Sequence, residues 1–95
     1  MTTDKGIAIL TIEDEPMVRR TLAAYLRKSG FTVHEAGDGA EGLALFERER
    51  PDLVLVDLRM PGMDGFAVLE ALSAQSPQTP LVVVSAADAI DDAIE

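Results

Sequence analysis

Acidic side chains stand directly after two short apolar runs of the sequence. Glu13 and Asp14 follow a run that ends at Ile12, and Asp57 follows a run that ends at Val56. Carboxylates packed together repel one another, by roughly 4 kcal/mol for two charges about 4 Å apart at an effective dielectric of about 20. A hard divalent cation removes that repulsion, and Mg2+ prefers carboxylate, carbonyl and water oxygens. These residue types therefore suit a magnesium site if the fold brings the two segments together.

The same residue types suit phosphoryl transfer. A carboxylate oxygen that is not held by a metal can attack phosphorus in line, while a bound cation neutralises the transferring group. Asp57 is central among the three carboxylates and is the best placed for that attack. A hydroxyl group, Ser85, follows a third apolar run at residues 81–84. The carboxyl ends of parallel strands meet at one edge of a sheet, so we expect all four side chains there.

Simpler interpretations need no chemistry. Glu13 and Asp14 could be the acidic start of a helix, where negative charge is favourable to the helix dipole. Asp57 could be a turn residue after a buried strand, and Ser85 could cap a strand end. Each is plausible for one residue alone, but their combination at these separations favours a shared site.

The elements that must position these residues alternate between strands and helices. Short continuous apolar runs indicate strands buried on both faces, and the alternating stretch 31–36 suits an edge strand. The strands are expected at residues 7–12, 31–36, 53–56 and 81–84. Helices are expected from Pro16 to Gly30, from about Gly39 to Arg50, from near Asp64, and from a cap at Asp88. This order predicts right-handed crossovers and helices on both faces of one parallel sheet.

Helical spacing also predicts which faces of the helices are buried. The apolar sets are Val18, Leu22 and Leu26 with Tyr25 beside them, then Ala40, Leu43 and Ala44, then Phe66, Leu69 and Leu72. Four basic residues of the first helix are expected on its solvated outer side: Arg19, Arg20, Arg27 and Lys28.

Composition narrows the classes of function. The 95 residues suffice for one domain, and 47% of them are hydrophobic. Acidic residues outnumber basic ones by 17 to 8, a net charge of -9, which disfavours direct binding of nucleic acid. The absence of cysteine excludes disulfides and thiolate chemistry. The apolar runs are too short for a signal peptide or a membrane span, which predicts a cytoplasmic protein without membrane contact.

Three motifs together resemble the receiver domains of two-component response regulators. They are Ile-Glu-Asp-Glu-Pro at 12–16, Val-Asp-Leu-Arg-Met-Pro-Gly-Met-Asp-Gly at 56–65, and Val-Ser-Ala at 84–86. The resemblance covers essentially the whole chain in register. It implies an α/β fold, a flavodoxin-like doubly wound parallel sheet with the strand order 2-1-3-4.

The resemblance also implies a role for each matching residue. Asp57 would be the phospho-acceptor and Ser85 the switch hydroxyl. Asp14 and Asp57 would bind Mg2+ directly, the backbone carbonyl of Arg59 would be the third protein ligand, and Glu13 would act mainly through metal-bound water. The phosphoryl donor would be a sensor histidine kinase or a phosphotransfer protein. The domain would regulate an output domain or partner protein, could form a homodimer, and would catalyse only its own phosphorylation and dephosphorylation.

One departure from the family pattern concerns the carboxyl end. The chain ends at Glu95 inside the pattern of the fourth helix, so we expect residues 1–95 to be a receiver domain that is incomplete at its C-terminus. The fifth strand, the fifth helix, the lysine that pairs with the phosphoryl group and the aromatic switch residue would lie beyond it.

Two other classes of function remain open at this stage. The first is an interaction module that has the receiver fold and works without phosphorylation. The second is a phosphatase or phosphomutase with an aspartyl nucleophile. Such enzymes usually have a second aspartate two residues after the nucleophile, where this sequence has Arg59.

Overall fold

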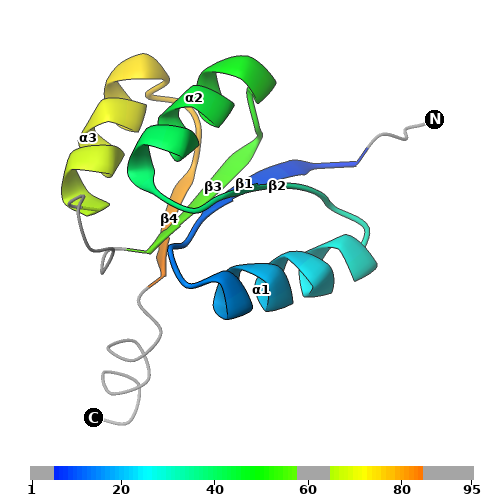
Figure 1. Ribbon diagram of the computed structural model, residues 1–95. Coiled ribbons are helices and arrows are strands. Elements are labelled where there is room, and N and C mark those ends of the chain that lie inside the picture. Colours follow the sequence, from blue (N-terminus) through cyan, green and yellow to red (C-terminus); the bar gives the residue numbers. More distant parts are fainter. Residues whose placement is uncertain (1–5, 58–64, 85–95) are drawn as a thin grey trace, which may run out of the picture.

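The computed structural model describes residues 6–57 and 65–84, which alternate between strands and helices. The strands are β1 (Ala8–Ile12), β2 (Thr32–Ala36), β3 (Leu53–Asp57) and β4 (Leu81–Val84). The helices are α1 (Pro16–Lys28), α2 (Gly39–Glu49) and α3 (Gly65–Gln75). The strands form one parallel sheet in the order β2-β1-β3-β4 (Figure 1). The expected fold class and strand order are therefore confirmed, whereas the helix expected from Asp88 lies outside the described residues.

Helices cover both faces of this sheet. Figure 1 shows α1 on one face and α2 with α3 on the other. The main core lies on the α2 and α3 side, and within the described ranges it contains eight buried residues: Leu10, Ile12, Ala36, Phe46, Val54, Val56, Val68 and Leu72. Because side chains alternate along a strand, Ile9 and Val33 point to the other face, and both are buried there. No helix in the described ranges is long and apolar enough to cross a membrane.

The buried face of α2 differs from the predicted one. Ala40 and Ala44 are exposed, whereas Gly39, Gly42 and Phe46 are buried. A Cβ atom at position 42 would lie 2.5 Å from Cδ1 of Ile12, so the missing side chain lets α2 approach β1 closely. The prediction was wrong for the two alanines because glycines, which carry no apolar side chain, do not register in a hydrophobic pattern.

Two further apolar expectations are corrected on the β4 side of the molecule. Val82 and Val83 are 42% and 46% exposed, so β4 is not buried on both faces as its composition predicts. It stands at an edge of the described sheet, with β3 as its neighbour. Phe66 is 62% exposed and Val68 is buried in its place, whereas Leu72 is buried as predicted and Leu69 packs against the core.

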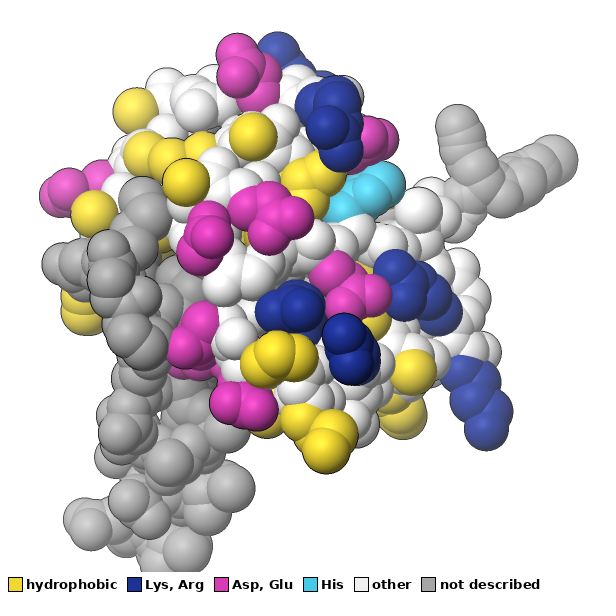
Figure 2. All heavy atoms as spheres, in the orientation of Figure 1, with side chains coloured by type: hydrophobic (Ala, Val, Ile, Leu, Met, Phe, Trp, Pro, Cys, Tyr) yellow, Lys and Arg dark blue, Asp and Glu magenta, His cyan; other side chains and the backbone are white. Residues whose placement is uncertain are grey.

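Helix α1 begins and ends as the sequence predicts. Pro16 is its first residue, where the missing N–H costs nothing. At the other end, the N–H of Phe31 donates to the carbonyl of Leu26, and Gly30 adopts a φ of 104°. This left-handed glycine turns the chain from α1 into β2. The apolar side chains of α1 are less buried than expected, since Val18 and Tyr25 are 46% and 68% exposed. Figure 2 shows hydrophobic side chains on the surface of this helix.

Candidate metal centre

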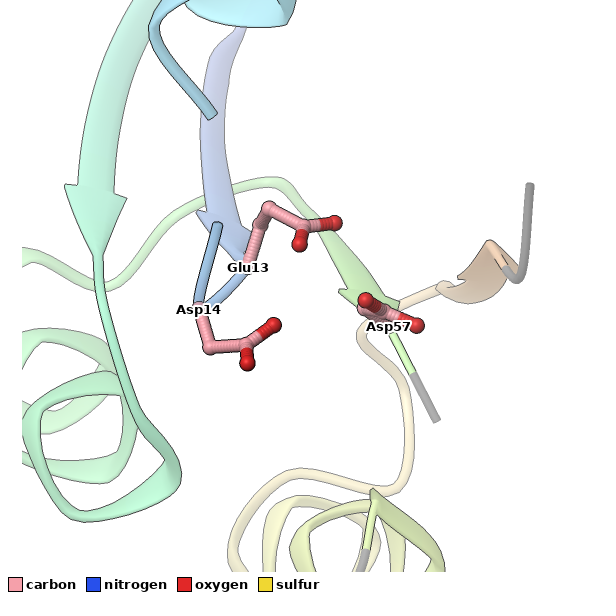
Figure 3. Close-up of side chains that lie close together, drawn as sticks. All are labelled: Glu13, Asp14 and Asp57. Atoms are coloured by element: carbon pink, nitrogen blue, oxygen red, sulfur yellow. The ribbon is translucent and has the colours of Figure 1, made fainter. Parts of the chain in front are cut away.

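Three carboxylates meet where β1 and β3 end. Ile12 pairs with Val56 in the parallel register, so Glu13 emerges from β1 beside Asp57, the last residue of β3. One carboxylate oxygen from each of Glu13, Asp14 and Asp57 lies within 4.8 Å of the others. Figure 3 shows the side chains of Glu13 and Asp14 extending from the end of β1 toward Asp57 at the end of β3. The gathering of these residues at one sheet edge, expected from the sequence, is thus present in the structure.

The loop between β1 and α1 has a defined conformation. The N–H of Glu13 donates to the carbonyl of Ala36 at 3.0 Å, which extends the contact between β1 and β2 by one residue. The Oε2 atom of Glu13 then accepts a hydrogen bond from the N–H of Glu15 at 3.0 Å. Glu15 stands at the N-cap of α1 without a capping bond from its side chain. The carboxylate of Glu13 therefore satisfies a backbone donor at the start of the helix and remains part of the acidic cluster.

The electrostatics of the cluster are unfavourable to negative charge. Glu13 is buried, and burial is the main reason why its pKa rises from 4.5 to about 7. The hydrogen bond from the Glu15 N–H lowers the pKa, while hydrogen bonding and repulsion by Asp57 raise it further. A cation placed among the three carboxylates would remove this penalty.

The donor set fits a hard divalent cation. Carboxylates are the ligands that Mg2+ prefers, and two of the three residues, Asp14 and Asp57, are half-buried, which leaves room for water in the coordination sphere. Arg59, whose carbonyl is an expected ligand, and Ser85 lie outside the described residues. Val84, the residue before Ser85, pairs with Asp57 in the sheet.

Arg19 is a functional candidate that the sequence analysis placed wrongly. Its side chain is only 18% exposed, and its Nη1 atom donates to the backbone carbonyl of Glu13 at 3.0 Å. Arg20, Arg27 and Lys28 are exposed, as expected. One signal was available in the sequence: Arg19 precedes Leu22 of the predicted apolar face by three residues and Leu26 by seven, which places it beside that face.

Comparison with known proteins agrees with this geometry. A family model described as the response regulator receiver domain matches residues 9–95. The chain belongs to this family. Receiver domains of this kind are components of two-component signalling, so the resemblance carried by the three sequence motifs is confirmed.

Relatives of this chain include two regulators of transcription. The chain is 35% identical over 88 residues to the probable transcriptional regulatory protein TcrX of Mycobacterium tuberculosis, and the match covers 93% of this chain and 38% of the relative. It is 44% identical over 86 residues to the transcriptional activator protein PfeR of Pseudomonas aeruginosa, covering 90% of this chain and 28% of the relative. The receiver thus spans well under half the length of these curated relatives.

A solved structure shows the same fold. The chemotaxis response regulator CheY4 of Vibrio cholerae superimposes with a TM-score of 0.78 at 30% identity, covering 83% of this chain and 68% of that one. The fold of the receiver is therefore that of a known response regulator, and its acidic cluster is the feature from which a function can be argued.

Proposed function

We propose that this receiver accepts a phosphoryl group on Asp57 in a reaction that needs Mg2+. The observation that carries the proposal is the convergence of Glu13, Asp14 and Asp57, whose carboxylate oxygens lie within 4.8 Å of one another. Two half-buried aspartates and a buried glutamate in one cluster lower the stability of the fold unless a bound cation compensates their negative charge.

Each residue has a separate part in this proposal. Asp14 and Asp57 would hold Mg2+ directly, with the carbonyl of Arg59, and Glu13 would act through a water ligand. When bound, the ion supplies positive charge that stabilises the phosphoryl group during transfer. The free oxygen of Asp57 attacks phosphorus, and the P–N bond of a phosphohistidine donor breaks. The histidine nitrogen leaves with the bonding pair and takes up a proton, so that an aspartyl phosphate and a neutral imidazole result.

The proposal extends to donor and output. The donor would be a sensor histidine kinase or a phosphotransfer protein, and Ser85 would turn toward the new phosphoryl group. Because Val84 pairs with Asp57, the chain immediately before Ser85 is already held beside the acceptor strand. The signal would pass to an output domain or partner protein in the cytoplasm. The names of TcrX and PfeR support an output in transcription.

The test is phosphorylation by a small-molecule donor. We expect acetyl phosphate with Mg2+ to add one phosphoryl group to the full-length domain, detected by intact-mass spectrometry, and beryllofluoride with Mg2+ to shift its amide resonances. Asp57→Asn should abolish both responses. Asp38→Asn is the matched control, because it removes the same charge at a helix cap outside the cluster and asparagine still caps α2.

Two outcomes would point to the other classes of function. Failure of the wild-type protein to respond, together with feeble Mg2+ binding, would favour an interaction module that works without phosphorylation. Repeated turnover of a small phosphate ester would favour a phosphatase. An undiminished response in Asp57→Asn would show that the acceptor has been misassigned.

A further inference from the structure

The side chain of Arg19 links the loop that carries Glu13 and Asp14 to strand β2. Arg19 stands in the second turn of α1, and its guanidinium has two partners on different elements. Nη1 donates to the backbone carbonyl of Glu13 at 3.0 Å, and Nε lies 3.5 Å from Oε1 of Glu35 on β2. The planar guanidinium, with donors in a fixed geometry, can hold two such partners at once.

The bond to Glu13 has a geometric consequence for the cluster. The carbonyl that Arg19 binds belongs to the peptide between Glu13 and Asp14, and a peptide group is planar. Fixing that carbonyl therefore fixes ψ of Glu13 and φ of Asp14 together. On the other side of Glu13, the N–H is held by the carbonyl of Ala36. The backbone that directs two of the three carboxylates is thus held from both sides.

Neighbouring residues surround the guanidinium of Arg19 closely. The Arg19 side chain is 18% exposed, and a Cβ atom at position 37 would lie 3.1 Å from its Nη1 atom. Only glycine at position 37 therefore leaves the guanidinium undisturbed. Glu35 is in turn held by Arg27, whose Nη1 donates to Oε2 of Glu35 at 2.9 Å. Figure 2 shows basic and acidic side chains next to one another on the face that α1 and β2 share.

We propose that Arg19 is a positioning residue, which orients the carboxylates of Glu13 and Asp14 toward Asp57 by holding the peptide between them against β2. This inference rests on the proposed function for its significance, since the cluster matters only if it binds Mg2+. Its structural part, the hold on the loop, can be measured without metal.

Two simpler roles give different results when Arg19 is replaced. If Arg19 only ties α1 to β2, then Arg27 does the same through Glu35 and the carbonyl of Val33, and replacing either residue should have the same effect. If Arg19 acts only through its charge, removing that charge makes the cluster more negative, so Mg2+ should bind more tightly. A positioning role predicts the opposite sign.

The experiment compares Arg19→Gln with its matched control, Arg27→Gln, in the full chain. Mg2+ affinity is measured by isothermal titration calorimetry. We expect Arg19→Gln to weaken Mg2+ binding about tenfold, as loss of a group that orients metal ligands commonly does. Arg27→Gln should leave the affinity within about twofold, because Arg27 bonds to Glu35 and to the carbonyl of Val33 and not to the peptide between Glu13 and Asp14.

Hydrogen exchange provides the readout without metal. The Glu15 N–H, which donates to the Glu13 carboxylate, should exchange about tenfold faster in Arg19→Gln and at the wild-type rate in Arg27→Gln, because local opening of the loop sets that rate. Arg19→Lys is the second variant. It keeps the charge, but one ammonium cannot occupy both the Nη1 and Nε positions, so the same two changes should appear in smaller measure.

Several results would overturn the inference. Unchanged exchange of the Glu15 N–H in both Arg19 variants would do so, and so would Mg2+ affinity that is unchanged or tighter in both. Equal effects of Arg19→Gln and Arg27→Gln would reduce Arg19 to a contact between α1 and β2. Absence of Mg2+ binding by the wild-type protein would instead defeat the proposed function, and the exchange measurement alone would then decide whether Arg19 holds the loop.

Discussion

The two faces of the sheet are held to their helices by different kinds of contact. On the α2 and α3 face, apolar side chains such as Phe46 and Leu72 are almost completely buried. On the α1 face, the buried apolar residues are accompanied by charged groups, with Arg19 and Arg27 both directed at Glu35. Buried apolar area stabilises a fold by about 25 cal/mol per Å2, whereas a partly exposed ion pair contributes about 1 kcal/mol or less. We therefore expect the apolar α2 and α3 face to supply more of the stability, and the more charged α1 face to orient the acidic cluster as proposed for Arg19.

The sharpest way to break this comparison is to remove an apolar side chain from the core. Phe46 is 2% exposed, and Phe46→Ala should lower the free energy of unfolding by about 3–5 kcal/mol through lost burial and the cavity left behind. Phe66→Ala is the control, because Phe66 is 62% exposed and its loss should cost about 1 kcal/mol or less. Urea unfolding measures both. Equal losses would mean that the two phenylalanines contribute alike and that the core has been misjudged.

The acidic cluster should make the stability of the metal-free protein depend on pH. Burial raises the pKa of Glu13 from 4.5 to about 7, so the folded state binds a proton that the unfolded state has released. The contribution of Glu13 is therefore fully present below about pH 4.5 and is lost as the pH rises through about 7. Within this window its loss amounts to at most about 1.4 kcal/mol per pH unit.

Glu13→Gln isolates that contribution. The variant cannot ionise at position 13, so its thermal unfolding should depend less on pH between about 4.5 and about 7 than that of the wild type. Mg2+ should also restore the stability of the wild type at neutral pH, because the cation replaces the proton among the carboxylates. Parallel pH profiles for the two proteins would contradict the assignment of the raised pKa to Glu13.

The close approach of α2 to β1 gives a prediction whose sign is decisive. In a helix, replacing glycine with alanine normally stabilises by roughly 0.5–1 kcal/mol. At position 42 the new Cβ would lie 2.5 Å from Cδ1 of the buried Ile12, and such overpacking costs about 1–3 kcal/mol. We therefore expect Gly42→Ala to destabilise the protein in urea unfolding. The exposed Ala44→Gly, which changes only helix propensity, calibrates the opposing effect, and a stabilised Gly42→Ala would refute the close contact.

The smallest change in the free energy of unfolding is expected for Arg27, the more exposed of the two arginines that contact Glu35. Arg27→Gln removes the ion pair with Glu35 and the hydrogen bond to the carbonyl of Val33, and should cost about 1 kcal/mol or less because the Arg27 side chain is 49% exposed. The loss should shrink as salt rises. The exposed Arg20→Gln serves as a control for charge. A loss as large as that of Phe46→Ala would overturn the contrast between the two faces.

Most of the fold could be predicted from the sequence because its signals are local and strong. The apolar runs gave four strands whose bounds fall within a residue of the expected ones, and Pro16 and Gly30 marked the ends of α1. The proximity of the carboxylates in the cluster could be predicted because the carboxyl ends of parallel strands lie at one edge of the sheet. That Asp57 accepts a phosphoryl group remains a prediction.

The misplaced residues share a physical reason. A hydrophobic pattern registers apolar side chains, so it missed a helix face built on Gly39 and Gly42 and assigned the exposed Ala40 and Ala44 instead. It also assigns every arginine to solvent, whereas the position of Arg19 depends on a carbonyl and a carboxylate contributed by other segments. Helical spacing could have placed Arg19 beside the apolar face, but the partners that it contacts there cannot be identified from the local sequence.

Gly37 extends the influence of the acidic cluster to a residue that contributes no ligand. Any β-carbon at this position would press on Nη1 of Arg19 from 3.1 Å and displace the guanidinium by a few tenths of an ångström. In a survey of all substitutions scored by signalling output, changes at position 37 should therefore cause a measurable loss, smaller than that at a residue of the cluster itself, while scoring as harmless in an assay of folding alone.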